Sequence, residues 1–312
     1  SEEKVILDIR SESGEEICES LDLGDPFAGD WYGLSFDNST SALKNIIIKY
    51  AHSGVAVEDS DINLENFFVL YGNYGVEGYG DSYIEIAGGV FDNLERDAIG
   101  FYGSGSITLT DTNISNVFGD ALGLYLGSLS ASNIRVENIS FGSALGIYDG
   151  SATIENATFE GGLDAGIELY GGSIDLRNSS VSGYPSGNLV FYGGTAVLKE
   201  LKIKDTNYGV SVYDGVVSLS ESAFEGILVN AVENYSDVVV SAENNWWGDA
   251  SGPYHEELNP EGEGAAIYGD VDFEPWCENE ECSTRNPVLI IPGVLGTEIF
   301  NGPQQLWLNL LD

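Results

Sequence analysis

The chain has 312 residues, with 51 acidic and 11 basic side chains and a formal net charge of −40. Nucleic acids and anionic lipid surfaces are therefore poor partners, because this protein would not neutralise their charge. No apolar run approaches the roughly 20 residues of a membrane span. The hydrophobic 43% of the sequence recurs in register, which favours a packed core over disorder. The acidity fits solubility, tolerance of high salt or loose binding of Ca²⁺ by carboxylate oxygens.

The N-terminal stretch precedes any repeat, and we expect residues 1–30 to form an opening or cap segment. It contains Cys18, whose partner the sequence does not reveal. The chain begins at Ser1 and has no methionine, so we treat it as a piece of a longer product.

A tyrosine recurs every 21–23 residues through most of the chain, each time at the end of a short apolar phrase such as AIGFY, ALGLY or GIELY. The eight members are Tyr79, Tyr102, Tyr125, Tyr148, Tyr170, Tyr192, Tyr213 and Tyr235. A repeat of this length cannot bury its apolar face alone, so successive repeats must stack, with strands paired in parallel about 4.8 Å apart. We therefore predict an all-β fold, a parallel β-helix solenoid of about ten coils of 21–23 residues over residues 31–243. We interpret the tyrosines mainly as stacked packing residues.

A second column lies eight residues after the tyrosine position. It holds Asn45, Asn66, Asn133, Asn156 and Asn178, then Glu200, Glu221 and Glu243. Stacked side-chain amides can hydrogen-bond from turn to turn where the backbone bends, so we predict an asparagine ladder. An apolar column three residues further on runs from Ile48 to Trp246.

Two phrases carry a family resemblance. WYGLSF (Trp31–Phe36) is followed by LKNIIIKYA (Leu43–Ala51), and NNWWGDASGPYHEELNPEGEGAAIYGDVDFEPW (Asn244–Trp276) ends the repeats. With them the chain resembles the right-handed parallel β-helices of the pectate-lyase-like superfamily, and among these the bacterial surface and S-layer-associated type. The resemblance implies that residues 244–276 form a closing cap. In that cap Trp246, Trp247 and Trp276 would cover the last turn.

The same resemblance leaves three functions open. Many such β-helices cut acidic polysaccharides, so a polysaccharide lyase or glycoside hydrolase is one alternative. A lyase would need a base, and the cationic residues available are Arg96, Arg135, Arg177, Lys199, Lys202 and Lys204. A hydrolase would need two carboxylates about 5–10 Å apart, which arise here by chance because acids are abundant. A scaffold that adheres to glycans, or a surface-layer repeat without a ligand, needs fewer features.

The histidines and cysteines do not indicate a catalytic site. We expect His52 and His255 to be turn or packing residues, and the Gly-His-Gly signature of polygalacturonase-like enzymes is absent. Cys277 and Cys282 bracket CENEEC and could close a small disulfide loop within a linker at residues 277–286.

The last segment, residues 287–312, differs in character. LIIPGVLGTEI and the later LWLNLL resemble the start of the lecithin:cholesterol acyltransferase-like branch of the α/β-hydrolase fold, which includes lipases and phospholipases. The resemblance implies a first strand at Val288–Ile291 and a backbone oxyanion-hole N–H at Val294 or Leu295. The nucleophile, acid and histidine of that family would lie beyond Asp312. We therefore expect no acyl transfer by this chain alone, and a lipid or ester substrate only for its longer parent.

Together these patterns predict a secreted or cell-surface protein of a bacterium or archaeon. A β-helix scaffold, with polysaccharides or other glycans as its partners, would carry the start of a lipase or acyltransferase-like domain.

Overall fold

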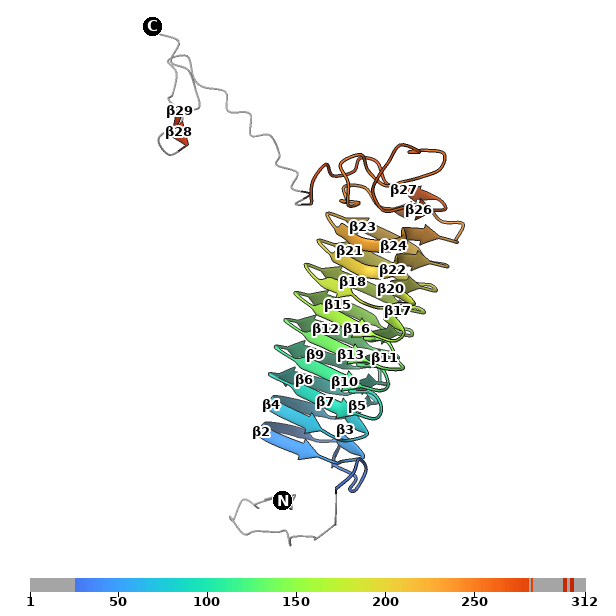
Figure 1. The fold of residues 1–312 in the computed structure, drawn as a ribbon. Coiled ribbons are helices and arrows are strands. Elements are labelled where there is room, and N and C mark those ends of the chain that lie inside the picture. The colour runs from blue at the N-terminus through green and yellow to red at the C-terminus, as the bar shows by residue number, and fades with distance from the viewer. Residues whose placement is uncertain (1–25, 281, 283–299, 302–303, 306–312) are drawn as a thin grey trace, which may run out of the picture. The chain divides into compact units, whose positions relative to one another are not determined.

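The computed structural model describes residues 26–280, 282, 300–301 and 304–305, which form strands and turns without a helix. The chain divides into two units, Ser1–Cys282 and Ser283–Asp312. In the first unit, parallel strands wind into a solenoid of about nine turns (Figure 1). In the second, β28 (Phe300–Asn301) pairs antiparallel with β29 (Gln304–Gln305). The predicted strand Val288–Ile291 and the residues Val294 and Leu295 lie outside the described residues.

The solenoid strands pair in three columns along its length. The first column comprises β1 (Leu34–Asp37), β3 (Ser53–Glu58), β5 (Tyr74–Tyr79), β8 (Ile99–Phe101), β11 (Leu122–Leu124), β14 (Leu145–Ile147), β17 (Ala165–Leu169), β20 (Gly187–Phe191) and β26 (Ile267–Tyr268). The second comprises β2 (Thr40–Lys49), β4 (Asp61–Leu70), β6 (Tyr83–Ala87), β9 (Ser106–Thr110), β12 (Ser128–Ser132), β15 (Ser151–Glu155), β18 (Ser173–Arg177), β21 (Thr195–Lys199), β23 (Val216–Ser220), β25 (Val240–Ser241) and β27 (Val271–Asp272). The third comprises β7 (Val90–Leu94), β10 (Asn113–Val117), β13 (Arg135–Ile139), β16 (Thr158–Gly162), β19 (Ser180–Ser182), β22 (Lys202–Val212) and β24 (Ala223–Asn234). Four long strands span two columns: β2 and β4 continue into the third, and β22 and β24 continue into the first, between β20 and β26.

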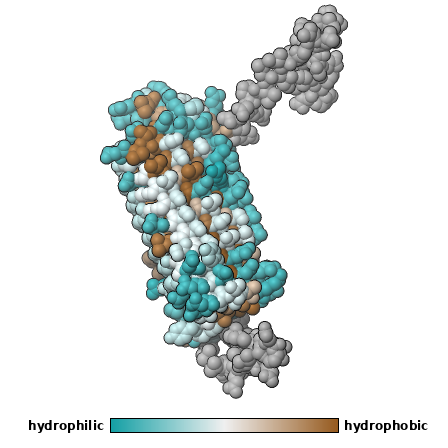
Figure 2. All heavy atoms as spheres, turned by 180° about the vertical axis from the view of Figure 1, so that it is seen from behind, coloured by the Kyte–Doolittle hydropathy of each residue, from teal (hydrophilic) through white to brown (hydrophobic). Residues whose placement is uncertain are grey.

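The constant register between paired strands produces the hydrophobic core. Side chains alternate between the two faces of a strand, so one residue in two points inward, and pairing in register places like on like. In the second column a single file of buried residues runs through eight turns: Leu64, Ile86, Leu109, Ala131, Ile154, Leu176, Leu198 and Leu219. On the face seen in Figure 2, hydrophobic residues lie in separate groups among hydrophilic ones.

The predicted apolar column is present in the third strand column, but its last member differs from the prediction. Its members from Ile48 to Phe224 are buried, but Trp246 does not continue it. Trp247 does: it is fully buried and stacks on the ring of Phe224 at a centroid distance of 4.9 Å. The last spacing is one residue longer than a constant repeat assumes.

The expectation of about ten coils was slightly too high. After β24 the repeat shortens to the two-residue strands β25, β26 and β27, and the chain leaves the solenoid path in the loop between β25 and β26. That loop contains the closing phrase, so the final repeat supplies a cap instead of a full turn.

Candidate functional site: the tyrosine column and its carboxylates

The eight tyrosines of the predicted column form one continuous ring stack from Tyr79 to Tyr235. Successive ring centroids are 4.4–5.3 Å apart, and successive planes differ by 2–22°. Each ring stands at or just after the end of a first-column strand, or of β22 and β24 where they continue that column, so parallel pairing in register superimposes the rings. Tyr268 follows Tyr235 at 5.4 Å but is tilted by 46°.

The residue two positions before each tyrosine decides how its ring lies. Paired in register, these residues are Glu77, Gly100, Gly123, Gly146, Glu168, Val190, Ser211 and Glu233. A Cβ on Gly100 would come within 2.9 Å of the Tyr102 ring, so this ring lies directly over the glycine backbone. The three rings that follow glycines are half-buried, whereas the other five are exposed.

Five of the tyrosine hydroxyls donate to carboxylates. Tyr79 donates to Glu77 (2.8 Å), Tyr102 to Asp97 (3.5 Å), Tyr148 to Asp120 (3.4 Å), Tyr170 to Glu168 (3.3 Å) and Tyr235 to Glu233 (3.2 Å). Where a glutamate stands two residues earlier, it is the acceptor. At two of the three positions that follow a glycine, those of Tyr102 and Tyr148, the hydroxyl reaches an aspartate, which for Tyr148 lies in the preceding turn.

The corner that contains Asp97, Asp120 and Ser143 in successive turns forms a chain of hydrogen bonds from turn to turn. The Asp120 N–H donates to Asp97 Oδ1 (3.0 Å), and the Ser143 N–H donates to Asp120 Oδ1 (2.8 Å). The Ser143 hydroxyl in turn donates to the carboxylate of Glu168. Three acidic groups therefore lie beside the tyrosine column within four successive turns, with Ser143 in the turn between Asp120 and Glu168.

Burial changes the acidity of these groups. It raises the pKa of Asp120 to about 6, and the neighbouring carboxylates of Asp97 and Glu168 add to the effect, against hydrogen bonds from Ser143 and Tyr148. Burial likewise raises the pKa of Asp97. It raises the pKa of Tyr170 to about 12, with the Glu168 carboxylate adding to the shift. Asp120 therefore keeps its proton to a higher pH than an ordinary aspartate does.

Residues 32–181 match the family model described as "Right handed beta helix region". The matched residues lie within the solenoid, which is a parallel β-helix. No curated protein and no solved structure matched the chain. The predicted β-helix fold is thus confirmed, whereas the hydrolase resemblance of residues 287–312 stays a prediction.

The stack limits how the β-helix can bind sugars. A sugar packs against the face of an aromatic ring. Within the column each face is covered by the next tyrosine, so only ring edges and hydroxyl groups face solvent. The column is therefore a packing element with a polar outer edge, and a glycan would have to bind through hydrogen bonds.

The predicted asparagine ladder occupies backbone corners. Asn45, Asn66, Asn133, Asn156 and Asn178 all have φ between 45° and 58°, in the left-handed region that asparagine tolerates better than most residues. The side-chain amide of Asn66 donates a hydrogen bond to Asn45 Oδ1 (3.1 Å), and that of Asn178 donates to Asn156 Oδ1. Asn133 donates to Asp111 instead (3.1 Å). Gly88 interrupts the ladder, and Asn244, not Glu243, ends the column with φ 60°.

Sequence reasoning missed a second corner five residues later. Its members also have positive φ: Tyr50, Tyr71, Asn93, Asn116, Asn138, Gly161, Gly183, Asp205 and Gly226. The signal was present as Asn or Gly five residues after most ladder positions. The amide of Asn116 donates to Asp92 (2.8 Å) and that of Asn138 to Asn116 (3.4 Å).

The three cap tryptophans have different environments. Trp247 is buried against the last turn, and the indole N–H of Trp276 donates to the Ala250 carbonyl (3.1 Å). Trp276 also packs partly buried against the core. Trp246 is partly exposed and takes part through its backbone, which bridges to Ala223. Two of the three side chains therefore shield the end.

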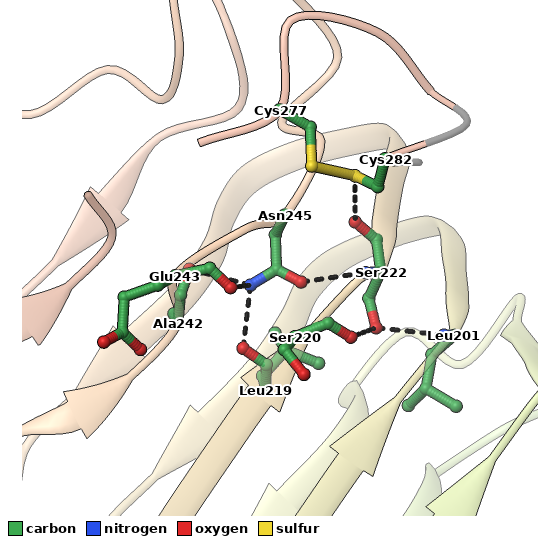
Figure 3. Close-up of a disulfide and its surroundings, with 9 residues drawn as sticks. All are labelled: Leu201, Leu219, Ser220, Ser222, Ala242, Glu243, Asn245, Cys277 and Cys282. Atoms are coloured by element: carbon green, nitrogen blue, oxygen red, sulfur yellow. Dashed lines mark hydrogen bonds between the residues drawn. A yellow bond between two sulfur atoms is a disulfide. The ribbon is translucent and has the colours of Figure 1, made fainter. Parts of the chain in front are cut away.

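A disulfide joins Cys277 to Cys282, with a Cα–Cα distance of 5.2 Å. Figure 3 shows it above Asn245, a fully buried residue that the sequence analysis did not identify. The Asn245 amide donates to the carbonyls of Leu219 (2.9 Å) and Ala242 (2.7 Å), and its Oδ1 accepts the Ser222 N–H (2.9 Å). The Cys277 N–H donates to the Asn245 carbonyl (2.9 Å), so the disulfide loop is attached to the β-helix at this buried asparagine.

The histidines make local contacts. His52 Nδ1 lies 3.1 Å from Asn73 Nδ2, and its ring meets Tyr32 and Tyr74 edge-on. His255 Nδ1 accepts the backbone N–H groups of Glu257 and Leu258, as expected of a turn residue.

The basic residues considered for a lyase lie mostly in exposed ion pairs. Arg135 pairs with Glu137 and Glu160, Arg177 with Asp175, and Lys199 with Glu221. Lys202 lies 3.5 Å from Glu280 of the disulfide loop. Because these pairs are exposed, each stabilises little.

Two surface depressions lie away from the tyrosine column. One of about 560 Å³ is lined by Thr40, Asp61, Asn63, Tyr83, Glu85 and Thr108 on the outer face of the second strand column. A second of about 390 Å³ lies beside Arg135 and Glu160.

Within residues 26–280 and 282, no three His, Cys, Asp or Glu side chains are placed to hold a metal ion. Calcium binding therefore stays a prediction. The described part of the chain also has no helix that is long and apolar enough to span a membrane.

Proposed function

We propose that the β-helix is a rigid extracellular scaffold that holds a neighbouring domain in place. The observation that carries this proposal is the unbroken ring stack of eight tyrosines beside an equally continuous buried core. Each turn packs only on its neighbours, so rigidity depends on every interface being filled. The C-terminal end is closed by Trp247 and the disulfide loop, which suits a solenoid that continues into a further domain.

The domain held there would be the lipase or acyltransferase-like one that residues 287–312 resemble. The lipid or ester chemistry belongs to the longer parent, and this chain contributes the scaffold. Glycan adhesion, if the scaffold has it, would use the polar depression between Thr40 and Thr108, whose hydroxyl, amide and carboxylate groups can hydrogen-bond to sugars.

Rigidity is tested in a Cys18→Ser background by spin labels on Asp81→Cys and Asp237→Cys, two exposed turn positions far apart along the β-helix. Pulsed electron–electron double resonance should give one narrow distribution of distances between the two labels, and this distribution should not change when glycans are added. A broad or multi-peaked distribution would contradict a rigid scaffold.

A second candidate function is favoured by one observation, the raised pKa of Asp120 beside Asp97 and Glu168. Glycoside hydrolysis uses two carboxyl groups, one of which has a raised pKa and gives up its proton as the general acid. The charge of −40 disfavours acidic polymers, so the substrate would be a neutral or amino-containing polysaccharide.

Reducing-end assays on neutral, amino and acidic polysaccharides, with and without Ca²⁺, distinguish the two functions. The scaffold predicts no new ends. Ends that appear with the natural sequence and vanish in Asp120→Asn would establish the enzyme.

A further inference from the structure

The structure points to a further activity in the tyrosine column, and we propose that it conducts one-electron oxidation along the β-helix. Oxidising equivalents delivered by a one-electron oxidant at one tyrosine would pass to tyrosines several turns away. This inference does not depend on the scaffold proposal.

The first requirement is electronic contact between neighbouring phenols. Electron transfer between aromatic rings falls off steeply with distance, and stacked rings in van der Waals contact are well coupled. All seven steps from Tyr79 to Tyr235 have centroid distances of 5.3 Å or less, with nearly parallel planes. At about 4.8 Å per turn, the stack spans roughly 34 Å, too far for a single direct transfer.

The second requirement is a place for the phenolic proton. A neutral phenol holds its proton up to pH values of about 10, but on losing an electron it becomes a strong acid. Five hydroxyls already donate to a carboxylate: those of Tyr79, Tyr102, Tyr148, Tyr170 and Tyr235. At these five tyrosines the phenolic proton can therefore move along the hydrogen bond to the carboxylate and later return.

Each step then balances. At Tyr148 the oxidant gains one electron, the O–H bond breaks, the proton forms a new O–H bond on Asp120, and a neutral tyrosyl radical remains. In the next step a neighbouring tyrosine gives its electron to this radical, and the Tyr148 oxygen takes its proton back from Asp120. The neighbour's own proton moves to its carboxylate or to water.

Contact with solvent and with carboxylates favours a hydroxyl on these rings. Because the column has a phenol in all eight turns, every ring of the stack can also be oxidised. The exposed ends, Tyr79 and Tyr235, allow an oxidant or a reductant to reach the stack from solution.

The test places an oxidant at one end and looks for oxidation at the other. In a Cys18→Ser background, Asp237→Cys is labelled with a ruthenium(II) polypyridine complex, two residues from Tyr235. Flash photolysis with a cobalt(III) quencher produces Ru(III), and a nitroso spin trap marks the tyrosyl radicals. Peptide mass spectrometry then locates the adducts. We expect adducts at Tyr79 and Tyr102 as well as near the label.

The decisive variant is Tyr148→Phe, which keeps a stacked ring but removes the oxidisable phenol. Adducts at Tyr79 and Tyr102 should fall at least tenfold, while those at Tyr170–Tyr235 remain. Tyr125→Phe should act in the same way, and Tyr254→Phe, in the cap outside the column, should leave the pattern unchanged. Asp120→Asn should lower distal labelling severalfold, because Tyr148 loses its proton acceptor.

Two outcomes would overturn the proposal. Adducts confined to the turns next to the label in the unsubstituted column would mean that the stack does not conduct. Distal adducts that persist unchanged in both phenylalanine variants would mean that oxidation arrives through solution.

Discussion

Glutamate occupies two positions in the corner of the asparagine ladder, where the other turns have asparagine, aspartate or glycine. Glu200 has φ 56° and Glu221 has φ 52°. A side chain with a Cβ costs roughly 1 kcal/mol in this region unless it can bond locally, as asparagine and aspartate do. These corners are therefore strained relative to their neighbours in the column.

Replacing Glu200 by asparagine should stabilise the protein by about 0.5–1 kcal/mol, because asparagine tolerates this backbone and can join the amide of Asn178. Urea unfolding followed by circular dichroism measures the change. Glu155→Asn, at an exposed position on strand β15, is the matched control and should bring no gain. A loss of stability in Glu200→Asn would show that the ion pairs near Lys199 matter more than the backbone.

Asp120 makes the stability of the β-helix depend on pH. Its folded pKa, about 6, lies above its ordinary value of 3.8, so the folded state binds the proton more tightly than the unfolded chain. The stabilising contribution is complete below about pH 4 and is lost as the pH rises through 6. At about 1.4 kcal/mol per pKa unit it amounts to about 3 kcal/mol.

The expected measurement compares unfolding free energies at pH 4, 6 and 8. The natural sequence should lose up to about 3 kcal/mol relative to Asp120→Asn between pH 4 and pH 8, because asparagine carries no charge to bury. Asp149→Asn, at an exposed aspartate in the following turn, controls for the general effect of removing one charge. Parallel pH profiles for all three proteins would refute the assignment.

At the scale of elements, the columns were easier to predict than the corners. Strand columns repeat the same residue types at nearly constant spacing, and the tyrosines show this most clearly. The corners accept Asn, Asp, Gly and even Tyr50, because what they share is a backbone angle and not a side chain. That is why the first corner was recognised from its asparagines, while the second, with mixed residue types, was missed.

The disulfide loop is the element whose stability can be tested separately. Closing a loop of about six residues is worth about 2 kcal/mol in the loop-entropy model. Reduction with dithiothreitol, or the double substitution Cys277→Ala and Cys282→Ala, should increase amide hydrogen exchange at position 277 and in the turn around Asn245. The strands from β3 to β20 should keep their protection, since each turn contacts only its neighbours. Loss of protection along the entire β-helix would show that the cap nucleates the fold.

At the scale of the whole molecule, charge opposes compactness. Fifty-one acidic residues against 11 basic ones repel one another over the surface of the folded chain. Salt screens such repulsion, with a Debye length of about 10 Å at 0.1 M. We therefore expect the melting temperature to rise by several degrees between about 10 mM and 500 mM NaCl.

The same titration tests calcium. CaCl₂ at matched ionic strength should act like NaCl if screening is the only effect. A much larger rise at low millimolar Ca²⁺ would reveal a specific site. A melting temperature that falls with salt would mean that attractive ion pairs, such as Arg135 with Glu160, outweigh the repulsion.

The sequence by itself determined the β-helix, because a period of 21–23 residues with matching side chains permits few other ways to bury an apolar face. It also determined which tyrosines and asparagines lie in file, since parallel pairing in register preserves sequence spacing. Only the tertiary structure decided what surrounds them: Asp97 and Asp120 reach the tyrosine hydroxyls because glycines two residues earlier let the rings lie flat. It likewise decided that Trp247 replaces Trp246 in the core, because one added residue in the last turn reverses which side chain points inward.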